Sequence, residues 1–142
     1  MTSLQLVYDA FLAKMLEDEW ANWELDEIQA DWRAILEGAI PFFKFPRVSL
    51  EIKDDNFVGD LTNDEIQILA NYMKCEWLNR TILTWENVKP LYEERDFSQA
   101  NLIDKFRTLL EKEETKARKL ESIYYRSINN KPFDYTKLAG KQ

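Results

Sequence analysis

The chain has 142 residues and carries 19 Lys and Arg against 26 Asp and Glu, a formal net charge of −7. Hydrophobic residues make up 45% and aromatic residues 13%, which suffices for one packed domain and excludes disorder throughout. The chain has no histidine and one cysteine. This excludes Ser-His-Asp and Cys-His catalytic groups, histidine metal ligands and an intramolecular disulfide.

Three features predict a soluble protein that is not secreted and has no membrane partner. The longest uncharged apolar run, from Gly38 to Phe43, is far shorter than the about 20 residues that a membrane helix needs. Asp9 stands where a signal peptide would be apolar. The single Cys75 suits a reducing compartment.

Charge is distributed unevenly along the chain. The first 64 residues hold five basic and fourteen acidic residues, a net charge of −9, whereas the rest hold fourteen basic and twelve acidic residues, a net charge of +2. One acidic run without a base comprises Glu17, Asp18, Glu19, Glu24, Asp26, Glu27 and Asp31. The bases after Thr115 are Lys116, Arg118, Lys119, Arg126, Lys131, Lys137 and Lys141. These runs are either solvated faces or complementary surfaces through which copies of the chain meet head to tail.

Apolar spacing of three and four residues predicts two helices in the first part of the chain. The first stripe consists of Leu4, Val7, Tyr8, Phe11 and Met15. Thr2 and Gln5 are a candidate capping box for this helix. The second stripe consists of Leu25, Ile28, Trp32, Ile35, Leu36 and Ala39. This helix is predicted to end near Gly38, because Pro41 lies just beyond.

A β-hairpin is predicted at about residues 47–59. Val48, Leu50 and Ile52 alternate with polar residues, which is typical of a half-buried strand. Residues 53–56 then form a turn, and Phe57 and Val58 return as the partner strand. An isolated hairpin is not stable, so it packs either on the helices or on a neighbouring subunit. The candidate residues for contact between subunits are Val48, Leu50, Ile52 and Phe57.

Thr62 and Glu65 form the clearest capping box and predict the start of a third helix. Its apolar stripe consists of Ile66, Leu69, Ala70, Met73 and Trp77. Cys75 points away from that stripe, so it is either a buried structural thiol or an interface residue. Residues 78–88 are ambiguous, and Pro90 ends or kinks any helix that reaches it.

A last long helix is predicted from about Gln99 to about Ser127, with Ser98 as a possible N-cap. Its apolar face consists of Leu102, Phe106, Leu109, Ala117, Leu120 and Tyr124. Glu113 interrupts this face. It lies either where the helix meets water or in an ion pair with a base of another subunit.

Residues 128–142 show no periodicity and form either a frayed terminus or a basic, aromatic arm that orders in the groove of a partner.

No constellation of residues predicts catalysis, a metal or a cofactor. Carboxylates are abundant, but nothing in the sequence places two of them in a cleft with a raised pKa. Glu17, Asp18 and Glu19 are consecutive and, on a helix, would not converge on one ion. The three glycines are isolated, which excludes a phosphate loop, and the net charge of −7 disfavours specific nucleic-acid binding. The five tryptophans are better explained by core or interface packing than by base stacking.

Several segments resemble one protein family. They are Phe45-Pro46, Leu50-Glu51-Ile52, the run from Leu61 to Ala70, Trp77-Leu78-Asn79-Arg80, Asp96-Phe97 and Gln99-Ala100-Asn101-Leu102. Together these segments resemble the small neck proteins of tailed bacteriophages, the head-tail connector, adaptor or head-completion proteins. The resemblance extends over about residues 4–126, and its motifs are structural.

The residue patterns above predict a mainly α-helical fold, a small bundle with a long C-terminal helix and a short β-hairpin insertion, and the resemblance implies that residues 1–127 are a helical adaptor domain. It implies a ring, typically dodecameric, that joins the portal to the next neck or tail-completion protein in the virion and lets DNA pass without specific binding. Residues 128–142 are then the portal-docking arm, with Ile128, Pro132, Phe133, Tyr135 and Leu138 as its contact residues. The acidic candidates for the channel wall are Glu17, Asp18, Glu19, Glu24, Asp26 and Glu27.

Two other functions remain open at this point. The first is a monomeric cytoplasmic helical regulator that binds one protein partner. The second is a carboxylate-dependent hydrolase, which requires two converging carboxylates in a pocket.

Overall fold

The computed structural model describes residues 1–15, 20–88, 97–128 and 131–132, with side chains described for residues 1–15, 20–84 and 103–126. The described residues form a mainly helical fold with a small antiparallel sheet and a long C-terminal helix, as the sequence predicts. The helical elements are α1 (Leu4–Ala13), α2 (Leu25–Ala39), the 3₁₀ turn η1 (Ile40–Phe42), α3 (Asn63–Val88) and α4 (Phe97–Tyr125). The strands are β1 (Thr2–Ser3), β2 (Ile52–Lys53), β3 (Asn56–Phe57), β4 (Ser127–Ile128) and β5 (Lys131–Pro132).

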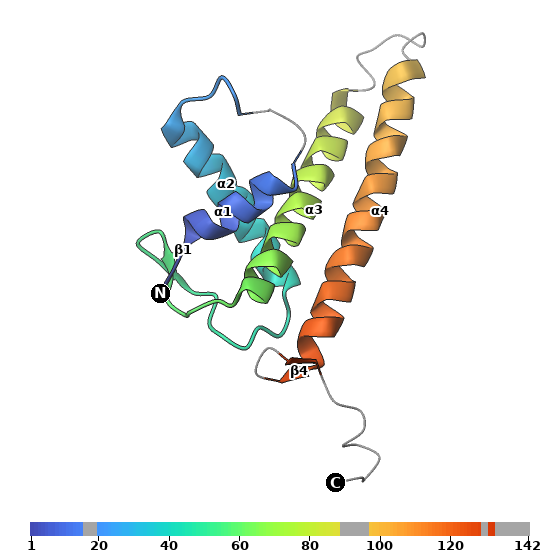
Figure 1. The fold of residues 1–142 in the computed structure, drawn as a ribbon. Coiled ribbons are helices and arrows are strands. Elements are labelled where there is room, and N and C mark those ends of the chain that lie inside the picture. Colours follow the sequence, from blue (N-terminus) through green and yellow to red (C-terminus); the bar gives the residue numbers. More distant parts are fainter. Residues whose placement is uncertain (16–19, 89–96, 129–130, 133–142) are drawn as a thin grey trace, which may run out of the picture.

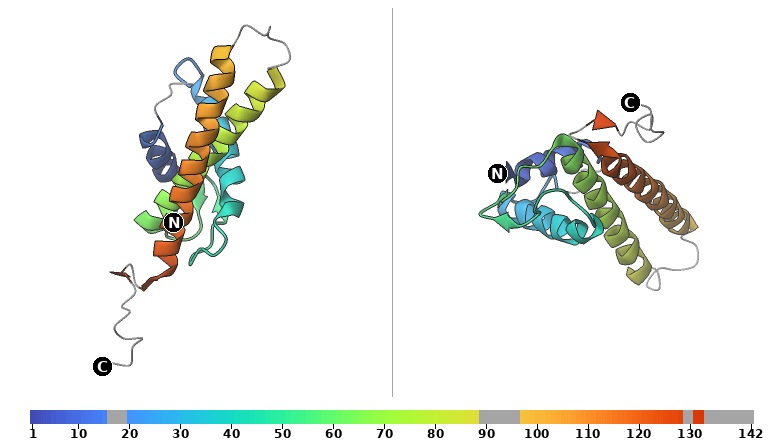
Figure 2. Two further views of the ribbon diagram at one scale, coloured as in Figure 1. Left: turned by 90° about the vertical axis from the view of Figure 1, so that its right-hand side faces the viewer. Right: turned by 90° about the horizontal axis from the view of Figure 1, so that it is seen from below.

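Helix α3 is the centre of the fold. It packs against α1 and α2 on one side and against α4 on the other, as Figures 1 and 2 show. α3 and α4 run antiparallel, and with 26 and 29 residues they extend about 39 and 43 Å at 1.5 Å per residue. α4 therefore lies at one edge of the molecule, and α2 with the β2–β3 hairpin lies at the opposite edge.

The core between α1, α2 and α3 is rich in aromatic side chains. Most residues of the two stripes predicted from the sequence are buried here, whereas Met15 and Ile28 are partly buried against this core and Leu25 at the start of α2 is 68% exposed. Trp20, from the loop between α1 and α2, packs edge-on against both Phe11 and Trp32, with ring centroids 5.8 and 6.0 Å apart. Such edge-to-face pairs contribute about 0.5–1.5 kcal/mol each beyond their burial. Trp20, Trp32 and Trp77 are therefore core residues, as the packing interpretation of the tryptophans predicts.

The predicted hairpin exists, but it is shorter than expected and has an additional partner. Asp54 and Asp55 have φ of 52° and 62°, a left-handed turn that joins β2 to β3. The residues from Val48 to Glu51 are not in a strand. β3 pairs with β2 on one side and with β1 on the other, so the sheet order is β1-β3-β2.

Strand β1 corrects the expected start of the first helix. Thr2 is not its cap: it lies in β1 opposite Phe57, and its hydroxyl accepts a hydrogen bond from the Leu61 N–H at 2.8 Å. Ser3 is the N-cap instead, and its Oγ accepts from the Gln5 N–H at 3.2 Å. The extended backbone that pairing with β3 requires ends one residue later than the sequence pattern indicates.

Phe57 is a residue of the chain's own core. Its side chain is fully buried, and its strand is paired on both edges. It is therefore not available for the contact between subunits that the sequence suggested. Leu50 and Ile52 are partly buried against the same core, so the hairpin packs on the helices.

The two long helices begin and end close to the expected positions. The capping box of α3 is confirmed: the Thr62 N–H donates to Glu65 Oε1 at 2.8 Å, and the Glu65 N–H donates to Thr62 Oγ1 at 3.3 Å. The ambiguous residues 78–88 are helical. α4 begins at Phe97, so Ser98 lies inside the helix and is not its N-cap.

Glu65 also links the start of α3 to the end of α4. The side chain is 1% exposed, and its Oε2 accepts a hydrogen bond of 2.8 Å from the Tyr124 hydroxyl near the end of α4. The same hydroxyl accepts from the Arg47 N–H at 2.7 Å, and the Arg47 guanidinium lies 4.4 Å from the centre of the Tyr124 ring. Burial and the hydrogen bond to Glu65 raise the pKa of Tyr124 to about 12. One buried carboxylate therefore connects α3, α4 and the loop that follows η1.

Replacing Tyr124 with Phe tests this connection. The variant leaves Glu65 Oε2 buried without its partner, and we expect the free energy of unfolding to fall by about 1–3 kcal/mol. The measurement is urea denaturation followed by circular dichroism. Tyr8→Phe is the matched control, because the Tyr8 ring is 3% exposed and its hydroxyl has no hydrogen-bond partner within the described residues. Equal losses in the two variants would contradict the role of Glu65.

Candidate functional site

The acidic candidates for the channel wall are partly described. Glu24 is the N-cap of α2, and Asp26 and Glu27 lie in its first turn, all exposed. Negative charge at a helix N-terminus is favourable, which gives these residues a structural reason for their position. Glu17, Asp18 and Glu19 lie outside the described residues.

The expected docking arm begins with a short hairpin. Ile128 pairs with Lys131 and Ser127 pairs with Pro132, so the first residues after α4 have regular structure that the sequence did not predict. Phe133, Tyr135 and Leu138 lie outside the described residues.

Both expectations for Glu113 are wrong. It is 9% exposed, so it does not meet water, and its Oε1 lies 3.2 Å from the Lys74 Nζ of the same chain. Lys74 is on the face of α3 that packs against α4, which a helical pattern within α4 alone does not reveal. The other oxygen of Glu113 has no hydrogen-bond partner within the described residues.

Cys75 is a buried thiol between α3 and α4, one of the two roles that the sequence left open. Burial, together with the charges of Glu114 and Glu113, raises its pKa to about 12, so the thiol stays protonated near neutral pH.

Within the described parts of the chain, no group of three acidic or cysteine side chains is arranged to hold a metal ion. No helix in these parts has the length and hydropathy needed to cross a membrane.

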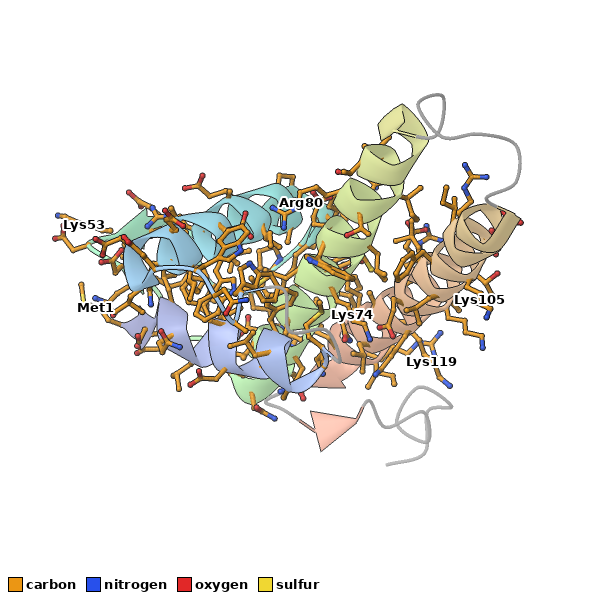
Figure 3. The ribbon with its side chains drawn as sticks, turned by 90° about the horizontal axis from the view of Figure 1, so that it is seen from above. Met1, Lys53, Lys74, Arg80, Lys105 and Lys119 are labelled. Carbon is orange, nitrogen blue, oxygen red and sulfur yellow. The ribbon has the colours of Figure 1, made fainter. Side chains whose placement is uncertain are left out.

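Asp31 connects α2 to α3 through an ion pair. The Arg80 Nη1 and Nη2 lie 2.6 and 3.1 Å from the two Asp31 oxygens, and the Trp20 indole N–H donates to Oδ2 at 2.7 Å. Figure 3 shows Arg80 between α2 and α3. Burial raises the pKa of Asp31, but the hydrogen bonds from Arg80 and Trp20 and the Arg80 charge together lower it below its usual value.

A row of basic residues lies along one exposed face of α4. We call it the basic stripe; its members are Lys105, Lys112, Lys116, Lys119 and Arg126. They recur at seven, four, three and seven residues, which places them on one helical face over about 31 Å. Figure 3 shows Lys105 and Lys119 on the side of α4 away from α3. None of the five forms an ion pair within the described residues, and the exposed Ile123 lies among them.

The opposite edge of the molecule carries an acidic surface. We define it by the exposed residues Glu24, Asp26, Glu27, Asp54 and Asp55. Asp26 and Asp55 line a hollow of about 490 Å³ between α1, α2 and the hairpin turn. Asp55 is partly balanced by Arg33, whose Nη1 lies 3.5 Å from Oδ1. Trp23 and Leu25 add exposed apolar area beside the α2 acids.

The charge asymmetry is visible in the sequence, but the basic stripe was not predicted, because the basic run recognised there begins only after Thr115 and leaves out Lys105 and Lys112. The helical spacing of basic residues within α4 was the signal that would have found the whole stripe.

Comparison of the chain with protein-family models, with curated proteins and with solved structures finds no match.

Replacing Asp31 with Asn tests the connection between α2 and α3. A carboxylate whose pKa is lowered by folding stabilises the fold above its unfolded pKa of about 3.9, and this contribution is lost as the pH falls through the folded value. Because Arg80 is 40% exposed, we expect Asp31→Asn to cost only about 1–2 kcal/mol at pH 7. The difference from wild type should shrink below about pH 4.

The measurement is the free energy of unfolding between pH 2 and pH 7. Asp26→Asn, at an exposed position in the first turn of the same helix, is the control and should change stability far less. A difference between Asp31→Asn and wild type that stays constant down to pH 2 would show that the Asp31 charge does not stabilise the fold.

Proposed function

We propose that the chain is a structural subunit of the neck of a tailed bacteriophage, a ring-forming adaptor that joins the portal to the tail. It works by binding copies of itself and the flanking rings, without making or breaking a covalent bond. Two things support this proposal. They are the family resemblance of residues 4–126 and the presence of complementary surfaces on opposite edges of one chain.

The observation that carries the proposal is the separation of charge. The basic stripe lies on α4, and the acidic surface lies at the other edge of the molecule, on α2 and the hairpin turn. When two different surfaces of one chain match each other, each copy binds the next in the same orientation. Such head-to-tail contacts close into a ring when the rotation between neighbours allows it.

Charge alone would make a weak contact. An exposed ion pair contributes about 0.2–1 kcal/mol, and salt screens it. Each surface also holds exposed apolar side chains, Trp23 and Leu25 on the acidic surface and Ile123 on the basic stripe. Burial of these side chains would add stability that salt does not screen, and closure of the ring would multiply each weak contact.

The proposal assigns Glu24, Asp26 and Glu27 to the contact between copies. Their alternative position, on the wall of a DNA channel, makes a different prediction, because residues on the wall would not affect assembly. Residues 128–142 would dock on the portal, and the neighbouring neck or tail protein would bind the other end of the ring.

Charge reversal on the stripe tests the proposal. We expect Lys112→Glu with Lys116→Glu to weaken assembly on the portal at least tenfold, because attraction at two positions becomes repulsion. Adding Asp26→Lys and Glu27→Lys to the same chain should restore assembly. The measurement is sedimentation velocity of the full chain mixed with the portal protein at low salt. Glu111→Lys, also exposed on α4 but away from the stripe, is the control.

Assembly that is unchanged by the double reversal would contradict the proposal. Failure of the four-residue variant to assemble, while the double reversal also fails, would place the acids on the channel wall. A wild-type chain that stays monomeric with the portal would favour the alternative, a helical regulator that binds one protein partner.

A further inference from the structure

A cavity of about 540 Å³ lies between α3, α4 and the segment that contains η1. It is separate from the basic stripe and from the acidic surface. Its size is within the range of about 300–1,000 Å³ that is usual for small-ligand sites. Three carboxylates line it, those of Glu76, Glu114 and Glu121, together with two aromatic rings and the cations Lys44 and Arg118.

Glu121 is the residue that indicates a ligand. It is 8% exposed, and its Oε2 accepts a hydrogen bond of 2.8 Å from the Tyr125 hydroxyl. Its Oε1 is buried and has no hydrogen-bond partner of good geometry within the described residues. The Tyr72 hydroxyl is the neighbouring donor, and burial together with its interaction with Glu121 raises the pKa of Tyr72. A buried polar atom without a partner costs about 1–3 kcal/mol, and more when the group is charged. A donor bound in the cavity would remove this cost.

Glu76 supplies a second carboxylate to the cavity. It forms no hydrogen bond or ion pair within the described residues, and burial raises its pKa. Its place in the cavity depends on Gly38 in α2, since a Cβ on Gly38 would lie 2.7 Å from Glu76 Oε2. Glycine is normally unfavourable inside a helix, and here the absence of a side chain lets the carboxylate pack against the α2 backbone.

Within the described residues, the cations that line the cavity form no ion pair with Glu76 or Glu121. Arg118 is paired with Glu114, its Nη2 3.5 Å from Oε2, and the Arg118 side chain is 73% exposed. Lys44 is also exposed and forms no ion pair within the described part of the chain. The net charge contributed by Glu76 and Glu121 is therefore negative in a partly enclosed space.

An aromatic wall completes the cavity. The Phe42 ring stacks on the Tyr72 ring with centroids 5.9 Å apart and an angle of 23° between the planes. Aromatic faces attract organic cations and pack against their alkyl or planar parts. A metal ion is a poor fit, because the cavity carboxylates and Cys75 do not form a group that converges on one ion among the described residues.

We propose that this cavity binds an organic cation, a guanidinium or alkylammonium group, between the carboxylates of Glu76 and Glu121 and the Phe42–Tyr72 wall. The cation is supplied either by a free small molecule or by an Arg or Lys side chain of a bound protein. The site does not depend on the proposed neck function, because its residues belong to neither of the surfaces assigned to assembly.

Isothermal titration calorimetry of the full chain tests the site with two probes that carry the same group. One is ethylguanidinium, a free small cation, and the other is a Gly-Arg-Gly peptide with blocked ends. Ethylurea, which has a similar shape and no charge, should not bind. We expect Glu121→Gln and Glu76→Gln each to weaken binding at least tenfold. Glu111→Gln, on the exposed surface of α4, should leave it unchanged.

The relative affinity of the two probes identifies the source of the cation. Binding of the peptide at least tenfold tighter than that of ethylguanidinium would assign the site to a protein side chain, and similar or weaker binding would assign it to a free small molecule. Absence of binding by both probes would overturn the proposal. So would binding that Glu121→Gln does not weaken, provided that circular dichroism shows the variant to be folded.

Discussion

The fold depends on one buried carboxylate at the end of the α3–α4 pair. Glu65 caps the first turn of α3 and accepts a hydrogen bond from the Tyr124 hydroxyl of α4. The Arg47 N–H, in the loop that follows η1, donates a hydrogen bond to the same hydroxyl. A buried charge is tolerated only when its oxygens are bonded, so this one residue sets where α4 ends against α3. The Lys74–Glu113 pair lies further along the same interface. Together these contacts leave the basic stripe facing away from α3, where another molecule can reach it.

The sequence predicted the features that short-range spacing determines. The apolar stripes of α1 and α2, the turn of the hairpin and the Thr62–Glu65 capping box each involve residues a few positions apart, and all are found. It did not predict contacts between residues distant in the chain. Strand β1 exists because Thr2 meets Phe57, and Glu113 is buried because Lys74 of another helix lies opposite it. Likewise, Glu65 was recognised as a cap, whereas its bond to Tyr124 requires knowledge of how α4 packs.

The candidate sites divide in the same way. The charge asymmetry is visible in the sequence, which left open whether the charged runs are solvated faces or complementary surfaces. Their positions on opposite edges of the molecule come from the packing of α4 on one side of α3 and of α2 on the other. The cavity had no signal in the sequence, because Gly38, Glu76 and Glu121 belong to three different helices. A neck adaptor needs only surfaces, whereas the cavity provides a separate place for a cationic group.

The central proposal is that this chain is a structural part of the neck of a tailed phage. The most direct measurement is electron cryomicroscopy of intact particles of the tailed phage to which the proposal assigns the chain. The account predicts a ring between the portal and the tail into which α1 to α4 fit without change, with the α4 stripe of each copy against the α2 acids of the next. Particles that contain no copy of the chain, or a ring in which α4 faces no neighbouring copy, would contradict it.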